Sequence, residues 1–109
     1  MRYCRKQTAI ALMAGLCAGG FLSAPAAADE LYELGRYLAG DCTACHKLDG
    51  QAAGIPAITG WPVEAFVMVM VAYKEGERDH ALMQTVARRL SDADMRALAV
   101  YFGKQGKQE

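Results

Sequence analysis

Two cysteines and a histidine stand close together near the middle of the chain, in the run Cys42-Thr43-Ala44-Cys45-His46. The spacing Cys-x-x-Cys-His is the attachment signature of c-type haem. Two thiols one helical turn apart can add to the two vinyl groups of a single haem, and the adjacent imidazole is then held beneath the iron. The motif therefore predicts one covalently attached haem c, bound through both cysteines, with His46 as the proximal iron ligand.

Other uses of a Cys-x-x-Cys pair fit the chain less well. A disulfide between Cys42 and Cys45 would close a loop too short to constrain much of the unfolded chain. A thioredoxin-like redox pair would need a strand-helix-strand pattern, which the sequence lacks. A structural zinc site takes four ligands, and beyond residue 28 the chain adds only His46 and His80 to the two cysteines, without a suitable second pair. Haem attachment is the interpretation that the motif favours.

The first 28 residues have the features of a secretory signal peptide. Three basic residues precede an apolar or small stretch over residues 8–22, and the alanines at 26–28 suit cleavage before Asp29. An uncleaved membrane anchor is the alternative, but the apolar stretch is shorter than the ~20 residues that span a bilayer comfortably. The sequence thus predicts a signal peptide over residues 1–28, a domain over 29–109, and export to the periplasm without stable membrane insertion.

The composition excludes some classes of function. Of the 109 residues, 53% are hydrophobic and 22% charged, which is typical of a globular protein and not of a disordered one. Twelve Lys and Arg balance twelve Asp and Glu, and no basic tract is interleaved with aromatic residues, so we expect no nucleic-acid partner. A domain of about 80 residues has a small core, and such domains commonly depend on a disulfide, a metal or a bulky cofactor for stability.

Apolar spacing predicts that the domain begins with a helix over residues 29–39, ended by Gly40. Gly35 lies inside this helix, where glycine costs about 1 kcal/mol relative to alanine. We therefore expect Gly35 to allow another backbone to approach closely. The apolar stripe of the helix is expected to consist of Leu31, Leu34, Tyr37 and Leu38.

Residues 62–75 are expected to form a second helix, although their valines also favour a strand. Pro62 suits a first helical position, Glu64 lies in the first turn, and Gly76 follows the end. From residue 65 to 73 the segment has no charged side chain, so the helix is apolar on nearly all sides. Either the rest of the domain covers both sides, or one side is available to a partner protein.

Two further helices are expected towards the C-terminus. Residues 84–90 should form a short one. The last helix has the start signal Ser-x-x-Asp at Ser91 and Asp94, and it should continue to Gly103. Together these elements predict an all-α domain.

A loop is expected over residues 47–60, because it contains several glycines and one proline. It is long for a connection without structure of its own, which suggests that it wraps around the haem. Pro56 is a candidate for packing against His46 and for offering its carbonyl to the free ring N–H. Such a contact fixes the tautomer of a ligating imidazole. The alternative is an ordinary turn proline.

The second axial ligand has several candidates. Four methionines follow residue 28: Met68, Met70, Met83 and Met95. Met83 is favoured, because it follows a polar turn and precedes the short helix, so a loop can bring it to the haem face opposite His46. The other three lie in the apolar run or inside the last helix, where methionine commonly fills gaps in a core. His80 is the competing ligand, but its charged neighbours favour exposure to solvent. Histidine and methionine together raise the reduction potential of haem.

With this ligand set, the chain resembles class I cytochrome c over residues 29–109. Residues 35–38 resemble the first helix of that family, whose glycine meets an aromatic residue of the last helix, here Tyr101 or Phe102. Residues 83–102 resemble the axial-methionine loop and C-terminal helix of the family. The resemblance implies a small all-α cytochrome c fold of about four helices wrapped around one covalently bound haem.

A closer resemblance concerns residues 72–78 and 83–87, which are similar to the haem subunit of flavocytochrome c sulfide dehydrogenase. It implies an electron-accepting subunit whose partner is a sulfide-oxidising flavoprotein. A free soluble monohaem carrier of a respiratory chain remains an alternative, because some such subunits have two haem domains and this chain has one motif. A haem enzyme or sensor with an open sixth position is the third. In the first two cases the protein transfers electrons between redox proteins and is not itself an enzyme.

Overall fold

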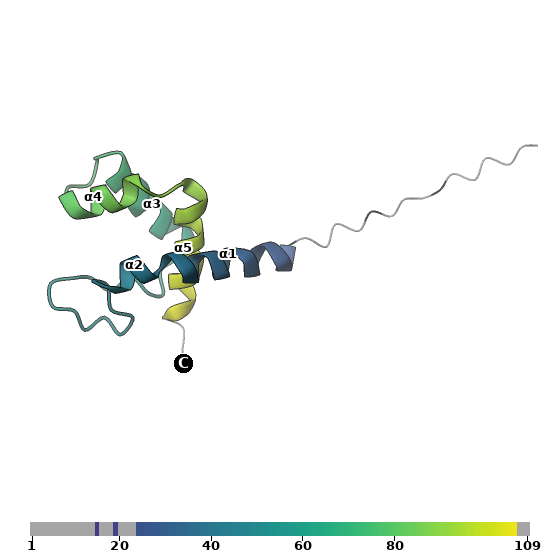
Figure 1. Cartoon of the computed structure of the whole chain (residues 1–109), viewed down its shortest axis with the longest axis horizontal. Coiled ribbons are helices and arrows are strands. Elements are labelled where there is room, and N and C mark those ends of the chain that lie inside the picture. The colour runs from purple at the N-terminus through teal and green to yellow at the C-terminus, as the bar shows by residue number, and fades with distance from the viewer. Residues whose placement is uncertain (1–14, 16–18, 20–23, 107–109) are drawn as a thin grey trace, which may run out of the picture.

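The structure is a computed structural model that describes residues 15, 19 and 24–106; within them the chain forms helices and no strand (Figure 1). The five helices are α1 (Ala24–Leu38), α2 (Gly40–Thr43), α3 (Val63–Lys74), α4 (Ala81–Arg88) and α5 (Asp92–Gln105). The all-α prediction is confirmed, and the four-residue α2 is one helix more than the resemblance implied. Most of the predicted signal peptide lies outside the described residues.

α1 and α5 cross at a point where both backbones come close (Figure 1). Gly35 of α1 is buried there, and a Cβ atom placed on it would lie 2.6 Å from the carbonyl carbon of Ala97 and 2.8 Å from Cβ of Tyr101. Only a residue without a side chain fits this space. The prediction that Gly35 admits another backbone is confirmed, and Tyr101 is the aromatic residue that it meets.

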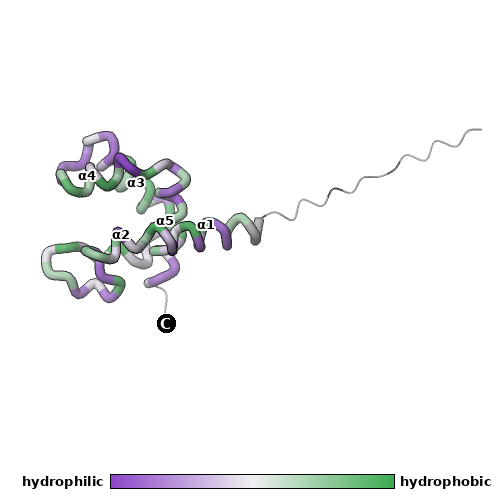
Figure 2. Tube along the Cα trace, viewed as in Figure 1, coloured by the Kyte–Doolittle hydropathy of each residue, from purple (hydrophilic) through white to green (hydrophobic). Residues whose placement is uncertain are grey.

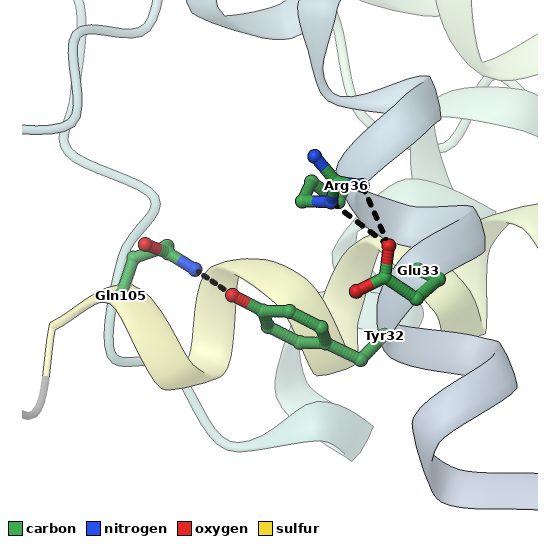
Figure 3. Close-up of polar contacts among 4 residues, drawn as sticks. All are labelled: Tyr32, Glu33, Arg36 and Gln105. Atoms are coloured by element: carbon green, nitrogen blue, oxygen red, sulfur yellow. Dashed lines mark hydrogen bonds and ion pairs between the residues drawn. The ribbon is translucent and has the colours of Figure 1, made fainter.

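Side chains beside the crossing join the same two helices (Figure 3). Gln105 Nε2 donates a hydrogen bond to the Tyr32 hydroxyl oxygen at 3.2 Å, and the rings of Tyr32 and Tyr101 lie 5.4 Å apart. The ion pair between Arg36 and Glu33 joins two exposed residues of α1 itself. An exposed pair of this kind adds little stability, so the crossing depends on packing.

The predicted apolar stripe of the first helix is wrong at Tyr37, which is 83% exposed. α1 makes its closest approach to α5 at Gly35, so its buried face runs through Leu31, Gly35 and Leu38, whereas Leu34 also lies on the exposed side. The helix also begins five residues before the predicted start at residue 29. It ends at Leu38, one residue before the predicted end, and Gly40 is the first residue of α2.

The core lies where α3 packs on α5. Phe66 and Met70 of α3 are 5% and 6% exposed, and the Phe66 ring stacks on the Phe102 ring with centroids 6.0 Å apart. The largest side chains that are fully buried all come from α5: Phe102, Met95 and Leu98. The predicted helix over 62–75 is confirmed, with Pro62 as its N-cap residue.

α5 begins as predicted and α4 does not. Ser91 Oγ accepts a hydrogen bond from the Asp94 N–H at 3.1 Å, and the Asp94 carboxylate accepts one from the Ser91 N–H at 2.9 Å. This reciprocal pair is the predicted start signal of the last helix. α4 starts at Ala81, three residues before the predicted position. Met83 therefore belongs to the first turn of a helix and not to the preceding loop.

Residues 44–62 connect α2 to α3 without helix or strand, so the predicted loop over 47–60 is confirmed. Hydrophobic and hydrophilic stretches alternate along this loop (Figure 2). The Gly60 N–H donates a hydrogen bond to the Phe102 carbonyl oxygen at 2.9 Å. This hydrogen bond fastens the end of the loop to α5.

No helix in the described part of the chain has both the length and the apolar character needed to cross a bilayer.

Candidate functional site

One cavity, of about 430 Å³, brings the cysteine-histidine motif and a methionine together. Cys42, Cys45 and His46 line it from α2 and the turn after α2, and Met83 lines it from α4. Its walls are largely apolar and include Ile58, Trp61, Phe66, Val69, Val86 and Leu98. The volume lies within the ~300–1,000 Å³ that is typical of pockets for small molecules and cofactors.

The backbone after α2 folds so that the whole motif faces one cavity. Cys42 is the third residue of α2, and its carbonyl oxygen accepts hydrogen bonds from the N–H groups of Cys45 at 3.1 Å and His46 at 2.8 Å. This continues the helical turn beyond the end of α2. As a result, two thiols and an imidazole line the same cavity from a segment of five residues.

Burial in the cavity wall, and after it the negative charge of Asp41, raise the pKa of the Cys42 thiol to about 11. The thiol is therefore protonated at neutral pH. Reactive cysteines of redox-active Cys-x-x-Cys pairs have lowered pKa values, because the thiolate is the reacting form. The environment of Cys42 fits a thioether, which has no proton to lose, better than it fits a catalytic dithiol.

The ring of His46 is held by a backbone carbonyl. Its Nδ1 lies 2.8 Å from the carbonyl oxygen of Pro56. A carbonyl oxygen can only accept, so Nδ1 has a proton and donates the hydrogen bond, and in the neutral ring Nε2 keeps a free lone pair. The contact between Pro56 and His46 that the sequence suggested is present. The hydrogen bond leaves the imidazole in the tautomer that binds a metal through Nε2.

Two methionines line the cavity, one more than the sequence analysis expected. Met83 is half-buried, and Met70 of α3 is 6% exposed and also belongs to the hydrophobic core. Met68 is 71% exposed, and Met95 is fully buried within α5; neither lines the cavity. The apolar run of α3 places apolar side chains on all sides of the helix. Its sequence therefore does not show that Met70 is the methionine that faces the cavity.

His80 lines the cavity and also caps α4. Its side chain is exposed, as expected, but Nδ1 accepts a hydrogen bond from the Met83 N–H at 3.3 Å. The ring also lies edge-on to Tyr73, with centroids 6.5 Å apart. The sequence does not reveal this cap, because helices usually begin with Ser, Thr, Asp or Asn. The missed cap explains why the start of α4 was predicted three residues too late.

Few polar side chains line the cavity, and sequence analysis did not identify Tyr73 or Arg78 among them. Arg78 Nε donates a hydrogen bond to the Tyr73 hydroxyl oxygen at 2.9 Å, and its guanidinium carbon lies 5.2 Å from the centre of that ring. Within the described residues, no three His, Cys, Asp or Glu side chains gather as a metal site. Two imidazoles line the cavity, but His80 Nδ1 is engaged by the Met83 N–H, so the candidate iron donors are His46 Nε2 and the sulfur atoms of Met70 and Met83.

This arrangement fits an iron porphyrin. Apolar walls suit the flat macrocycle, and the two thiols stand at the spacing that its vinyl groups require. An imidazole with a free Nε2 and a methionine sulfur are the axial donors found together in electron-carrying haem proteins. Chemically, the site can hold a one-electron centre away from water.

Comparison with models of protein families finds no match to the chain. The chain is 37% identical over 71 residues to cytochrome c-554(548) of Halomonas halodenitrificans, a match that covers 61% of this chain and 86% of that protein. It is 28% identical over 94 residues to the cytochrome subunit of sulfide dehydrogenase of Chlorobaculum tepidum, a match that covers 85% of this chain and 86% of that subunit. The thiosulfate dehydrogenase electron acceptor of Thiomonas intermedia is 36% identical over 69 residues, and the chain spans only 32% of its length.

The similarity to cytochrome c-554(548) covers most of that protein, and it agrees with the helices and the cavity described above. The cysteines and the histidine of the motif line that cavity together with Met83. The chain therefore belongs to the class I cytochromes c, electron carriers with a c-type haem.

Proposed function

We propose that this chain is an exported electron carrier with one haem c, which Cys42 and Cys45 would hold through thioethers and whose iron His46 and Met83 would bind. The observation that supports the proposal most strongly is that these four side chains line one cavity. When bound, haem c supplies an iron that gains and loses one electron. The protein itself makes or breaks no bond in another molecule. The chain binds and orients this centre and excludes water from it.

Each residue of the site has a distinct part in this function. His46 presents Nε2 in a fixed orientation because Nδ1 is bound to the Pro56 carbonyl oxygen. Met83 offers a neutral, polarizable sulfur, which favours the ferrous state and raises the reduction potential. The apolar walls also favour the ferrous state, because it has the lower charge. The two thioether links keep the cofactor from dissociating.

Replacing Met83 with leucine tests the sixth ligand. The ferric wild-type protein is expected to have the charge-transfer band of an iron–methionine sulfur bond, and the Met83→Leu variant should lose it. Its ferrous form should then bind carbon monoxide rapidly. Its reduction potential should fall by a substantial part of the ≈ 0.8 V over which axial ligands set haem potentials. Absorption spectra and redox titration measure these effects.

Met70→Leu is the matched control, because Met70 is the other methionine of the cavity. Leucine has nearly the volume of methionine, so each variant costs less than about 1.5 kcal/mol in packing and differs from the wild type mainly by the lost sulfur. Loss of the band in the Met70 variant alone would reassign the ligand to α3. A wild-type protein without the band that binds carbon monoxide rapidly would instead support an enzyme or sensor with an open sixth position.

We further propose that the carrier accepts electrons from a flavoprotein in a complex like sulfide dehydrogenase. The cytochrome subunit of that enzyme aligns with 85% of this chain. α3 offers an apolar outer surface for docking, because Met68 and Val71 are exposed there while Val69 and Met70 line the cavity. A free carrier is the second candidate, favoured by the match to 86% of cytochrome c-554(548).

Isolation of the tagged protein from the periplasm of its own host distinguishes a subunit from a free carrier. A subunit is expected to elute with a flavin-containing chain in equal amount, and the measurement is the ratio of flavin to haem absorbance. A Met68→Asp variant should reduce that ratio, because it places a charge on the outer surface of α3. Recovery of a haem-containing monomer without flavin would favour the free carrier.

A further inference from the structure

We propose that His80 is a positioning residue for Met83, acting through its hydrogen bond at the start of α4. The inference depends on the proposed function, in which the Met83 sulfur binds iron. It gives His80 a role that differs from the ligand role considered in the sequence analysis. In this role the imidazole never touches the iron, and it controls how firmly the methionine is held.

The hydrogen bond joins His80 to the backbone of the proposed ligand itself. His80 has an extended backbone, with φ −173° and ψ 107°, directly before the first residue of α4. Its Nδ1 accepts from the Met83 N–H at 3.3 Å. Met83 is the third residue of the helix, and N–H groups in a first turn have no partner within the helix. The side-chain cap therefore fixes the backbone position from which the Met83 sulfur extends.

His80 is itself held by the helix on the other side of the turn. Its ring meets the ring of Tyr73 edge-on, with an interplanar angle of 78°. Arg78 bridges the turn, since its Nε donates to the Tyr73 hydroxyl oxygen at 2.9 Å and its carbonyl oxygen accepts from Gln84 Nε2 at 3.0 Å. These contacts join the end of α3 to the start of α4. A shorter capping side chain could accept the same hydrogen bond, but it could not also pack on Tyr73.

α4 needs such a cap because it has only eight residues. Isolated helices shorter than about 12 residues are marginal in water, so α4 depends on its packing and its ends. Ala87 is its one buried residue and lies in the last turn, one helical turn beyond Met83. In the first turn, the half-buried Met83 packs against the core and the Gln84 side chain reaches the Arg78 carbonyl oxygen, but the cap is the side-chain hydrogen bond made to the backbone of Met83 itself. Opening of this turn would release the Met83 sulfur from the iron.

Cyanide binding to the ferric full-length holoprotein at neutral pH measures this opening, because cyanide enters only after the methionine leaves. His80→Ala removes the acceptor, and the binding rate is expected to rise about fivefold, the factor that corresponds to a typical N-cap. His80→Asn provides a side-chain acceptor again, without the ring that packs on Tyr73, and should remove most of the acceleration. Ser91→Ala is the matched control, because it removes the cap of α5 and leaves α4 intact. Its rate should equal that of the wild type.

The outcomes separate this inference from the proposed function. A His80→Ala rate equal to the wild-type rate would overturn the positioning role, as would an equal acceleration in Ser91→Ala. An Asn variant as fast as the Ala variant would also overturn it, because the ring and not the acceptor would then hold the turn. If the wild-type protein lacks the iron–methionine band, ligation by Met83 itself is refuted. Retention of the band in His80→Ala also shows that His80 is not the ligand.

Discussion

Replacing Cys42 and Cys45 together with alanine is expected to abolish the folded protein instead of producing a stable haem-free domain. The cavity that the cofactor is proposed to fill has a volume of about 430 Å³. Without the cofactor, the apolar side chains that line this cavity would be exposed to water, which costs about 25 cal/mol per Å² of apolar surface. The whole stability of a natural domain is about 5–15 kcal/mol. The few fully buried side chains of α5 cannot offset such a loss.

Acid-acetone extraction and circular dichroism measure the two parts of this result. The wild-type polypeptide should keep its red colour after extraction, whereas the double variant should lose all haem, show little helical signal and be degraded in cells. Thr43→Ala is the control, because Thr43 lies between the cysteines and its hydroxyl only donates to the Gly40 carbonyl oxygen at 3.3 Å. A helical, protease-resistant double variant without haem would refute the dependence of the fold on its cofactor.

The sequence predicts most of the fold where a local signal specifies an element. Ser91 and Asp94 form the expected reciprocal cap, and Val63–Lys74 form a helix in spite of their valines. Tyr37 shows the limit of such reasoning. Its spacing places it on an apolar stripe, yet it is 83% exposed, because the close approach at Gly35 rotates the contact face of α1 away from it. Which side of a helix is buried depends on its neighbour, and no local pattern contains that information.

In the candidate site, too, the sequence predicts the features that a local motif specifies and not those that depend on tertiary contacts. Cys42, Cys45 and His46 can be identified from spacing alone, and the contact with Pro56 follows from the need of an imidazole for a partner. The surroundings of Met83 could not be predicted, because the cap that starts α4 is a histidine and its packing on Tyr73 is a tertiary contact. Motif chemistry can thus be predicted from the sequence, whereas the geometry that holds the sixth ligand requires the fold.

Replacing Gly35 with alanine is expected to destabilise the protein by about 3 kcal/mol, at the upper end of the usual cost of overpacking. The new Cβ would collide with the backbone carbonyl of Ala97, which cannot move without displacing α5. Alanine favours a helix over glycine by about 1 kcal/mol, which is too little to compensate. For a domain of this size, the loss lowers the melting temperature by about 15 °C. Thermal and guanidinium unfolding of the ferric protein measure the effect.

Gly40→Ala is the matched control for this substitution. A Cβ on Gly40 meets no atom within 4 Å, and Gly40 is the exposed first residue of α2. The same chemical change is therefore expected to leave stability unchanged or to raise it by a few tenths of a kcal/mol, because alanine restricts the unfolded chain. If both variants behave alike, the crossing of α1 and α5 tolerates a side chain. A large loss at Gly35 alone ties stability to the backbone contact with Ala97, and haem attachment at α2 should then become less efficient in that variant, since α2 directly follows α1.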